Sequence, residues 1–236
     1  MQLSKLENGV YGELRKNKMV LFKARDLCAL LKIDKVKAYN IIKALKNKGV
    51  IIKIGGSYFA FKDANEFSIA SGIHWPSYIS FWSALNYYGL SDQMPKEIFL
   101  ATAKYTKNMG KFKYITLSKK RFFGYAQIGD IVIADKEKAV IDSLLLPKYA
   151  GGIREIIKSI NSGFNELNIK KLSDYAVKIE SKAVLRRLGF ILEEINYKEK
   201  ELKKLGKNIG KGYELLDPNL PKKNNLNNKW LLDINI

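Results

Sequence analysis

Apolar and polar residues follow a helical period over most of the first fifty positions. Apolar side chains recur every three or four residues, which predicts three helices, over residues 4–16, 24–31 and 35–48. The apolar segment 19–22, between the first two helices, is short enough to be a strand. Asp34 precedes the third helix, where its carboxylate can accept hydrogen bonds from first-turn amides, and Gly49 suits the left-handed residue that ends a helix.

The period of the pattern changes from 3.6 to 2 directly after the third predicted helix. Residues 50–54 and 58–61 are rich in β-branched and aromatic side chains, which predicts two strands. Gly55 and Gly56 between them permit the tight turn of a β-hairpin. Helix, strand, helix, helix and hairpin is the order of a winged helix-turn-helix, whose third helix enters the major groove of duplex DNA. We therefore expect residues 1–62 to form such a domain.

The third predicted helix has one apolar and one polar face. The apolar side should pack on the first two helices and consists of Ala38, Ile41, Ile42 and Leu45. The polar side provides six candidate DNA-binding residues, which are Lys35, Lys37, Tyr39, Asn40, Lys43 and Lys46. Lysines contact phosphates as point charges, whereas Asn40 can form two hydrogen bonds to one adenine and is the strongest candidate for base recognition. The hairpin adds Lys53, Ser57 and Tyr58 as candidates. A solvated face without a ligand is the alternative.

The remaining two thirds of the chain combine strand and helix patterns. Strands are expected at residues 98–103, 113–117, 125–128, 130–134, 213–216 and 230–236. Helices are expected at residues 81–88, 136–146, 153–161, 169–178 and 181–195, with Ser80 and Asp135 as the N-caps of the first two. Residues 63–73 are expected to be a linker or connecting helix, and residues 74–236 a larger mixed α/β domain. The chain as a whole is therefore assigned to the α+β class.

The net charge of the chain indicates which kinds of partner it can bind. The 236 residues include 42 Lys+Arg and 23 Asp+Glu, a formal net charge of +19, and such a surplus attracts polyanions over a distance. Nucleic acid is the partner it favours, although lysine-rich solvated surfaces give the same count. Residues 1–70 hold 14 Lys+Arg and 6 Asp+Glu, a surplus of eight.

A single cysteine excludes an intramolecular disulfide, and no apolar run is long enough to span a bilayer, so we expect a cytoplasmic protein without membrane partners.

One stretch of the second part lacks acidic residues altogether. Residues 98–129 contain no Asp or Glu but seven basic residues, which are Lys104, Lys107, Lys111, Lys113, Lys119, Lys120 and Arg121. Aromatic residues lie between them, as in surfaces on which nucleic-acid bases stack. DNA beside an operator, an RNA or an acidic protein face are the candidate ligands. Strand alternation alone also places lysines on one sheet face and core aromatics on the other. A later lysine cluster, which begins at Lys198, is expected to be a solvated helix face or tail.

The sequence contains few signs of catalysis. His74 and Cys28 are the only histidine and cysteine, which excludes a zinc site built from His and Cys ligands. No phosphate-binding loop, nucleophile elbow or dinucleotide motif is present. We therefore expect a protein that is not an enzyme and that needs neither a metal nor a cofactor. The one enzyme class to weigh is a metal-dependent nuclease, because four carboxylates cluster along one strand and helix: Asp130, Asp135, Glu137 and Asp142.

Several spaced motifs resemble a known family. Residues 76–80 (PSYIS) and 83–90 (SALNYYGL) resemble the start of the C-terminal domain of the AbiEi antitoxin family. Three later elements agree in their order, and they are the basic strand end 102–107, residues 122–125 (FFGY) and residues 134–142 (ADKEKAVID). The resemblance covers about residues 1–200, and none of its motifs is catalytic.

This resemblance implies a function in two parts. Proteins of the family bind inverted repeats in their own promoter through a winged helix and repress the operon. Their C-terminal domain counteracts a nucleotidyltransferase-like toxin, in several members without a stable complex. The resemblance thus implies an autorepressing antitoxin of an abortive-infection toxin–antitoxin pair, with duplex DNA and the cognate toxin as partners. The residues themselves also permit a stand-alone winged-helix regulator whose C-terminal domain serves dimerisation or ligand sensing.

Overall fold

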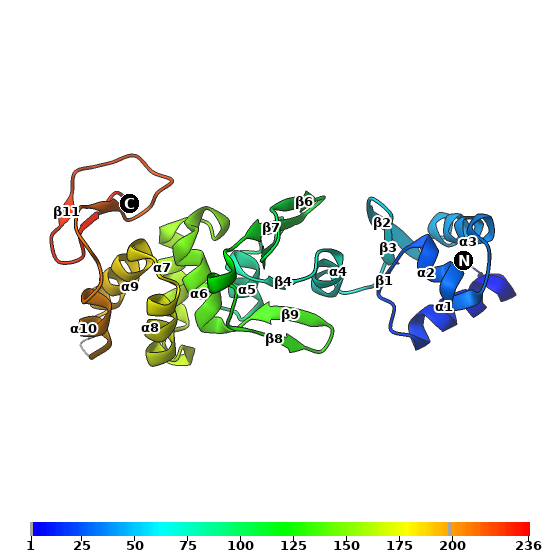
Figure 1. Ribbon diagram of the computed structural model, residues 1–236, viewed down its shortest axis with the longest axis horizontal. Helices are drawn as coiled ribbons and strands as arrows, with labels where there is room; N and C mark the ends of the chain where they lie inside the picture. The colour runs from blue at the N-terminus through cyan, green and yellow to red at the C-terminus, as the bar shows by residue number, and fades with distance from the viewer. Residues whose placement is uncertain (1, 198–199) are drawn as a thin grey trace.

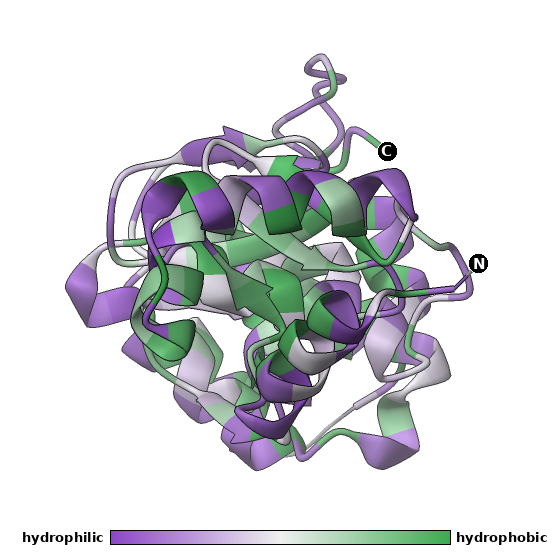
Figure 2. Ribbon diagram, turned by 90° about the vertical axis from the view of Figure 1, so that its right-hand side faces the viewer, coloured by the Kyte–Doolittle hydropathy of each residue, from purple (hydrophilic) through white to green (hydrophobic). Residues whose placement is uncertain are grey.

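The chain folds into a mixed α+β structure around two hydrophobic cores (Figure 1). The computed structural model describes residues 2–197 and 200–236. The smaller core is built from residues 10–61, and the larger core from residues 60–232. The two parts lie along one long axis, with the N-terminal helices at one end (Figure 1). Viewed from that end, hydrophobic residues gather in the interior and the outward helix surfaces are hydrophilic (Figure 2).

The first part contains six elements in the expected order. They are α1 (Lys5–Lys16), β1 (Leu21–Phe22), α2 (Ala24–Leu31), α3 (Lys35–Asn47), β2 (Ile51–Gly55) and β3 (Tyr58–Phe61). The strands form an antiparallel sheet in the order β1-β3-β2. A reciprocal capping box starts α1, because the Ser4 hydroxyl accepts from the Glu7 amide while the Glu7 carboxylate accepts from the Ser4 amide.

The segment 63–73 is a structured part of the larger fold. It contains α4 (Glu66–Ile73), and Asn65 caps this helix by accepting from the Phe67 amide at 2.8 Å. Ile69, Ala70 and Ile73 are buried in the larger core. Of the two alternatives expected for residues 63–73, the structure has the helix, and this helix packs on the larger core.

A six-stranded mixed sheet organises the larger part, in the order β6-β7-β5-β4-β9-β8. Its strands are β4 (Ser77–Ile79), β5 (Ile98–Thr102), β6 (Lys107–Met109), β7 (Phe112–Thr116), β8 (Tyr125–Ile128) and β9 (Ile131–Ala134). The sequence pattern does not predict β4, which pairs with both β5 and β9 near the centre of the sheet. All three of its residues are buried, so it lacks the alternation that marks a half-exposed strand. The sheet lies between α4 on one face and α5 (Phe81–Tyr87) and α6 (Lys136–Leu145) on the other (Figure 1).

Helices and a small third sheet complete the larger part. The helices are α7 (Ile153–Ser162), α8 (Ile169–Lys178), α9 (Lys182–Glu194) and α10 (Lys200–Gly206), with 3-10 turns η1 (Lys119–Arg121), η2 (Pro147–Tyr149) and η3 (Phe164–Glu166). The last sheet has the order β10-β12-β11, formed by β10 (Glu214–Leu215), β11 (Leu226–Asn227) and β12 (Leu232–Asp233).

Trp230 fixes the last sheet to α9. Its buried ring lies against Gly189, where a Cβ atom would be 2.1 Å from the indole, and its N–H donates to Glu193 at 2.7 Å.

Lys198, the first residue of the lysine cluster that precedes the last sheet in the sequence, lies outside the described residues. Within residues 2–197 and 200–236, no helix combines the length and the apolar character that crossing a bilayer requires.

Candidate nucleic-acid interface

The outer face of α3 is exposed along its whole length. The four residues predicted for the inner face are the four that are buried: Ala38, Ile41, Ile42 and Leu45. The six residues predicted for the outer face are all exposed: Lys35, Lys37, Tyr39, Asn40, Lys43 and Lys46. Asp34 caps the helix as predicted by accepting from the Lys37 amide at 2.9 Å, and this hydrogen bond lowers the pKa of the Asp34 carboxyl. In Figure 1, α3 lies in the end of the molecule away from the larger part.

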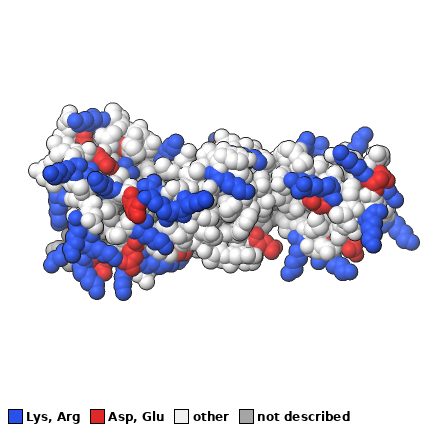
Figure 3. Space-filling model, viewed as in Figure 1, with Lys and Arg blue, Asp and Glu red and all other residues white. Residues whose placement is uncertain are grey.

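The lysines of this face lack carboxylate partners. Within the described chain, no Asp or Glu oxygen lies within 4.0 Å of the ammonium groups of Lys35, Lys37, Lys43, Lys46 or Lys53. Glu7 and Glu13 pair with lysines outside this face, as Glu7 does with Lys48 at 2.6 Å, whereas Asp34 lies at the start of α3 as its N-cap. Basic side chains outnumber acidic ones at this end of the molecule (Figure 3). The face therefore presents uncompensated positive charge, the property on which phosphate binding depends.

The hairpin residues divide into two groups. Lys53 and Ser57 are exposed, in agreement with the expectation that they are accessible to a ligand. Tyr58 is half-buried and packs on the larger core, and its hydroxyl donates to the Ile73 carbonyl at 3.4 Å. The Lys23 ammonium lies 4.2 Å from the centre of the Tyr58 ring. Tyr58 is thus a residue of the junction between the two parts, because its hydroxyl points toward α4 and not toward solvent.

A pocket of about 390 Å³ lies beside α3, between α2 and the hairpin turn. Its polar lining combines three cations with two hydroxyls, from Lys23, Arg25, Lys35, Tyr39 and Ser57. Such donors suit a phosphate oxygen. Lys23 and Arg25 are not among the DNA-binding candidates predicted from the sequence. Their place at the start of the helix before α3 was the available signal, because in a helix-turn-helix the first helix crosses the DNA backbone.

The seven basic residues of the segment 98–129 do not form one surface. Three of them pair with carboxylates outside the segment: Lys111 with Glu66, Lys113 with Glu97 and Lys120 with Glu180. Arg121 donates to two backbone carbonyls just beyond α8. Among the residues that the structure describes, only Lys104, Lys107 and Lys119 of this set lack such partners. The interleaved Phe112 and Tyr114 are core residues.

Three of the four carboxylates of the nuclease hypothesis have structural partners. Asp135 caps α6 as predicted and accepts from a first-turn amide at 2.8 Å. The Lys171 ammonium lies 3.0 Å from both Asp135 and Glu137. Burial raises the pKa of Glu137, but a backbone N–H and the Lys171 ammonium outweigh it and lower the pKa. Asp130 is exposed between β8 and β9. Across the described ranges, no three His, Cys, Asp or Glu residues are grouped so that they could hold a metal ion.

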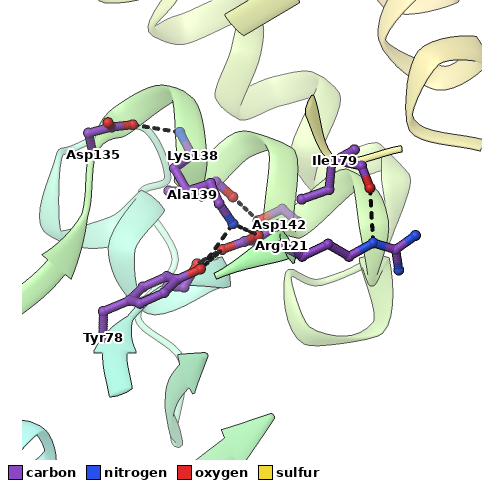
Figure 4. Close-up of polar contacts among 9 residues, drawn as sticks. Tyr78, Arg121, Asp135, Lys138, Ala139, Asp142 and Ile179 are labelled. Carbon is purple, nitrogen blue, oxygen red and sulfur yellow. Dashed lines mark hydrogen bonds and ion pairs between the residues drawn. The ribbon is translucent and has the colours of Figure 1, made fainter. Parts of the chain in front are cut away.

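Asp142 belongs to a buried polar network (Figure 4). It forms an ion pair with Lys138, one turn away on α6, and both side chains are fully buried. Tyr78 of β4 donates to Asp142 at 3.0 Å and accepts from Lys138 at 2.9 Å. The Ser80 hydroxyl also donates to Asp142, at 2.8 Å, so it does not cap α5 as the sequence predicts. Burial and then the Asp142 charge raise the pKa of Tyr78 well above its usual value, and burial lowers the pKa of Lys138.

These features define an α+β protein with two cores and an exposed basic helix face. No family model matches the chain, and no curated protein matches it. Among solved structures, the chain is similar to the crystal structure of the RV2827C protein from Mycobacterium tuberculosis, with a TM-score of 0.68 and 12% sequence identity. The likeness covers 98% of this chain and 92% of that chain. At this identity the two proteins share a fold over nearly their whole lengths.

Proposed function

We propose that the chain is a DNA-binding antitoxin that represses its own operon. The observation that carries the DNA-binding part is the exposed α3 face, whose lysines have no carboxylate partners within the described chain. We assign the residues up to 62 to a winged helix-turn-helix, in which α3 enters the major groove and the β2–β3 hairpin is the wing. An operator with inverted repeats then takes two copies, one for each half-site.

Five of the six residues of the α3 face have a role in this proposal. Asn40 reads a base, because its amide can donate and accept at the same time. The four lysines of α3 contact phosphates and fix the position of the helix without reading sequence. Lys53 and Ser57 of the wing reach the backbone beside the helix. The pocket lined by Lys23 and Arg25 holds one further backbone phosphate.

Two single variants separate base reading from phosphate contact. We expect Asn40→Ala to weaken binding to the operator by about 1–3 kcal/mol and to relax sequence choice at one base pair. Lys37→Ala should weaken binding to all duplexes alike and lower the slope of log affinity against log salt by about 0.9. Gel shifts on DNA from upstream of the gene, between 50 and 200 mM salt, measure both effects. Equal losses of the Asn40 variant on operator and scrambled duplex would contradict base reading.

The antitoxin part rests on the motifs that resemble the AbiEi family. Residues 76–90 contain β4 and α5, and residues 134–142 run from the last residue of β9 into α6. They include Tyr78, Lys138 and Asp142, so the resemblance reflects the buried centre of the larger part and leaves the toxin-directed surface undefined.

Growth under co-expression tests the antitoxin role. A neighbouring gene for a nucleotidyltransferase-like toxin should arrest growth when it is expressed alone, and the full chain should restore growth. A full-length variant that no longer binds DNA should restore growth as well, because we assign DNA binding to the first part of the chain and toxin neutralisation to the larger part. A solitary gene without an effect on growth would favour a stand-alone regulator.

A further inference from the structure

We infer that the β6 edge of the larger part extends the DNA interface beyond the wing, with Lys104, Tyr105 and Lys107 against the phosphate backbone that flanks the α3 site. The inference rests on the proposed DNA binding by α3. It adds a second contact region, contributed by a different part of the chain, and therefore a longer stretch of bound duplex.

The wing and the β6–β7 hairpin touch each other. Gly55 ends β2 at the wing turn, and a Cβ atom there would lie 2.8 Å from Cγ of Met109 in β6. A side chain at position 55 would require the Met109 side chain to move. In Figure 1, α3, the wing and β6 follow one another along the upper side of the molecule. A duplex on α3 and the wing therefore continues naturally toward β6.

Lys107 lies on the side of the sheet that faces the first part. It is two residues from Met109 on β6, so the two side chains share one face of the strand. Lys107 also stands opposite Tyr114 in the strand register, and the Tyr114 hydroxyl donates to the Ala70 carbonyl of α4 at 2.7 Å. The α4 side of the sheet is the side toward the wing (Figure 1).

The loop before β6 holds Lys104 on a fixed backbone. The Lys104 amide donates to Thr102 Oγ1 at 3.1 Å, and its carbonyl accepts from the Thr116 hydroxyl at 2.8 Å. Buried His74 supports the next residue, with Nε2 3.2 Å from the Tyr105 carbonyl oxygen and its ring edge-on to the Tyr105 ring. Tyr105 remains 67% exposed. A loop ordered before binding loses little conformational entropy when it meets a ligand.

Ion pairing distinguishes the lysines of this edge from one another. Within the described residues, Lys104 and Lys107 have no carboxylate partner, whereas Lys111 and Lys113 of the same hairpin are ion-paired. Only the first two are thus available for phosphates. Duplex DNA is favoured over RNA or a protein partner because this surface continues directly from the wing.

The test compares two double variants that remove the same charge. One is Lys104→Ala with Lys107→Ala, and the control is Lys111→Ala with Lys113→Ala. Footprinting first locates the bases whose protection depends on Asn40. Two duplexes are then used, a short one of about one helical turn, ~10 bp, around those bases and a long one with about one more turn on each side. Circular dichroism checks that both variants fold as the wild type does.

We expect the Lys104/Lys107 variant to lose affinity for the long duplex only. Two lost phosphate contacts lower the salt slope by about 1.8. The ratio of wild-type to variant affinity for the long duplex therefore falls about 12-fold between 50 and 200 mM salt. The control should bind both duplexes much as the wild type does. The inference would be overturned if both double variants lost the same affinity, or if the wild type bound the short and the long duplex equally well. Either result would leave the proposed binding by α3 intact.

Two further outcomes are distinct. If the wild type binds neither duplex, the proposed DNA-binding function fails, and this inference fails with it. If the Lys104/Lys107 variant loses affinity for a single-stranded RNA of the same length and keeps its affinity for the long duplex, the edge is an RNA site and the DNA inference is wrong.

Discussion

Replacing Asp142 by alanine is expected to lower the free energy of unfolding by about 3–5 kcal/mol. The change leaves the fully buried Lys138 ammonium without its counter-ion and takes the acceptor from Tyr78 and Ser80. An uncompensated charge in the core cannot be hydrated, which is the source of the large effect. Urea unfolding followed by tryptophan fluorescence measures it, because all three tryptophans of the chain lie in the larger part.

Two control variants define what the Asp142 result means. Asp174→Ala breaks the exposed pair with Lys204 and should cost no more than about 1 kcal/mol, since exposed ion pairs contribute little. The double change Lys138→Met with Asp142→Leu removes both charges and should be more stable than Asp142→Ala. A single Asp142→Ala variant that unfolds at the urea concentration of the wild type would contradict the importance of the network.

Removing the four α3 lysines together is expected to abolish most DNA affinity. The variant carries alanine at Lys35, Lys37, Lys43 and Lys46. Loss of four phosphate contacts lowers the salt slope by about 3.6, and at 50 mM salt we expect binding at least ~100-fold weaker than that of the wild type. Fluorescence anisotropy on a labelled upstream duplex, titrated at several salt concentrations, gives both quantities. The fold should persist because these side chains are exposed.

A matched variant distinguishes the effect of where the lysines lie from the effect of the total charge of the chain. It carries alanine at four exposed lysines of the larger part: Lys158, Lys170, Lys203 and Lys207. Both variants change the net charge by the same amount. If DNA binding is local to α3, this second variant keeps the salt slope of the wild type. A similar loss in both would mean that long-range attraction by the whole chain accounts for the affinity.

Local patterns were enough to predict the elements of the first part. The bounds of α2 and β3 agree with the hydrophobic pattern, and so do the buried face of α3 and the Asp34 cap. In the larger part, β8, α8 and the Asp135 cap were likewise predicted. These features depend on residues a few positions apart, because periodicity and capping involve only neighbours along the chain.

Contacts between distant segments determined the remaining features. The central strand β4 carries no alternation, and the role of Ser80 follows from Asp142, which lies 62 residues further on. The stretch 98–129 has no acid of its own, yet Glu66, Glu97 and Glu180 neutralise three of its lysines. Whether a basic residue is free for a ligand depends on charges within a few ångströms in space, and sequence separation does not report that distance. The available lysines of α3 and β6 could therefore be distinguished only in the folded molecule.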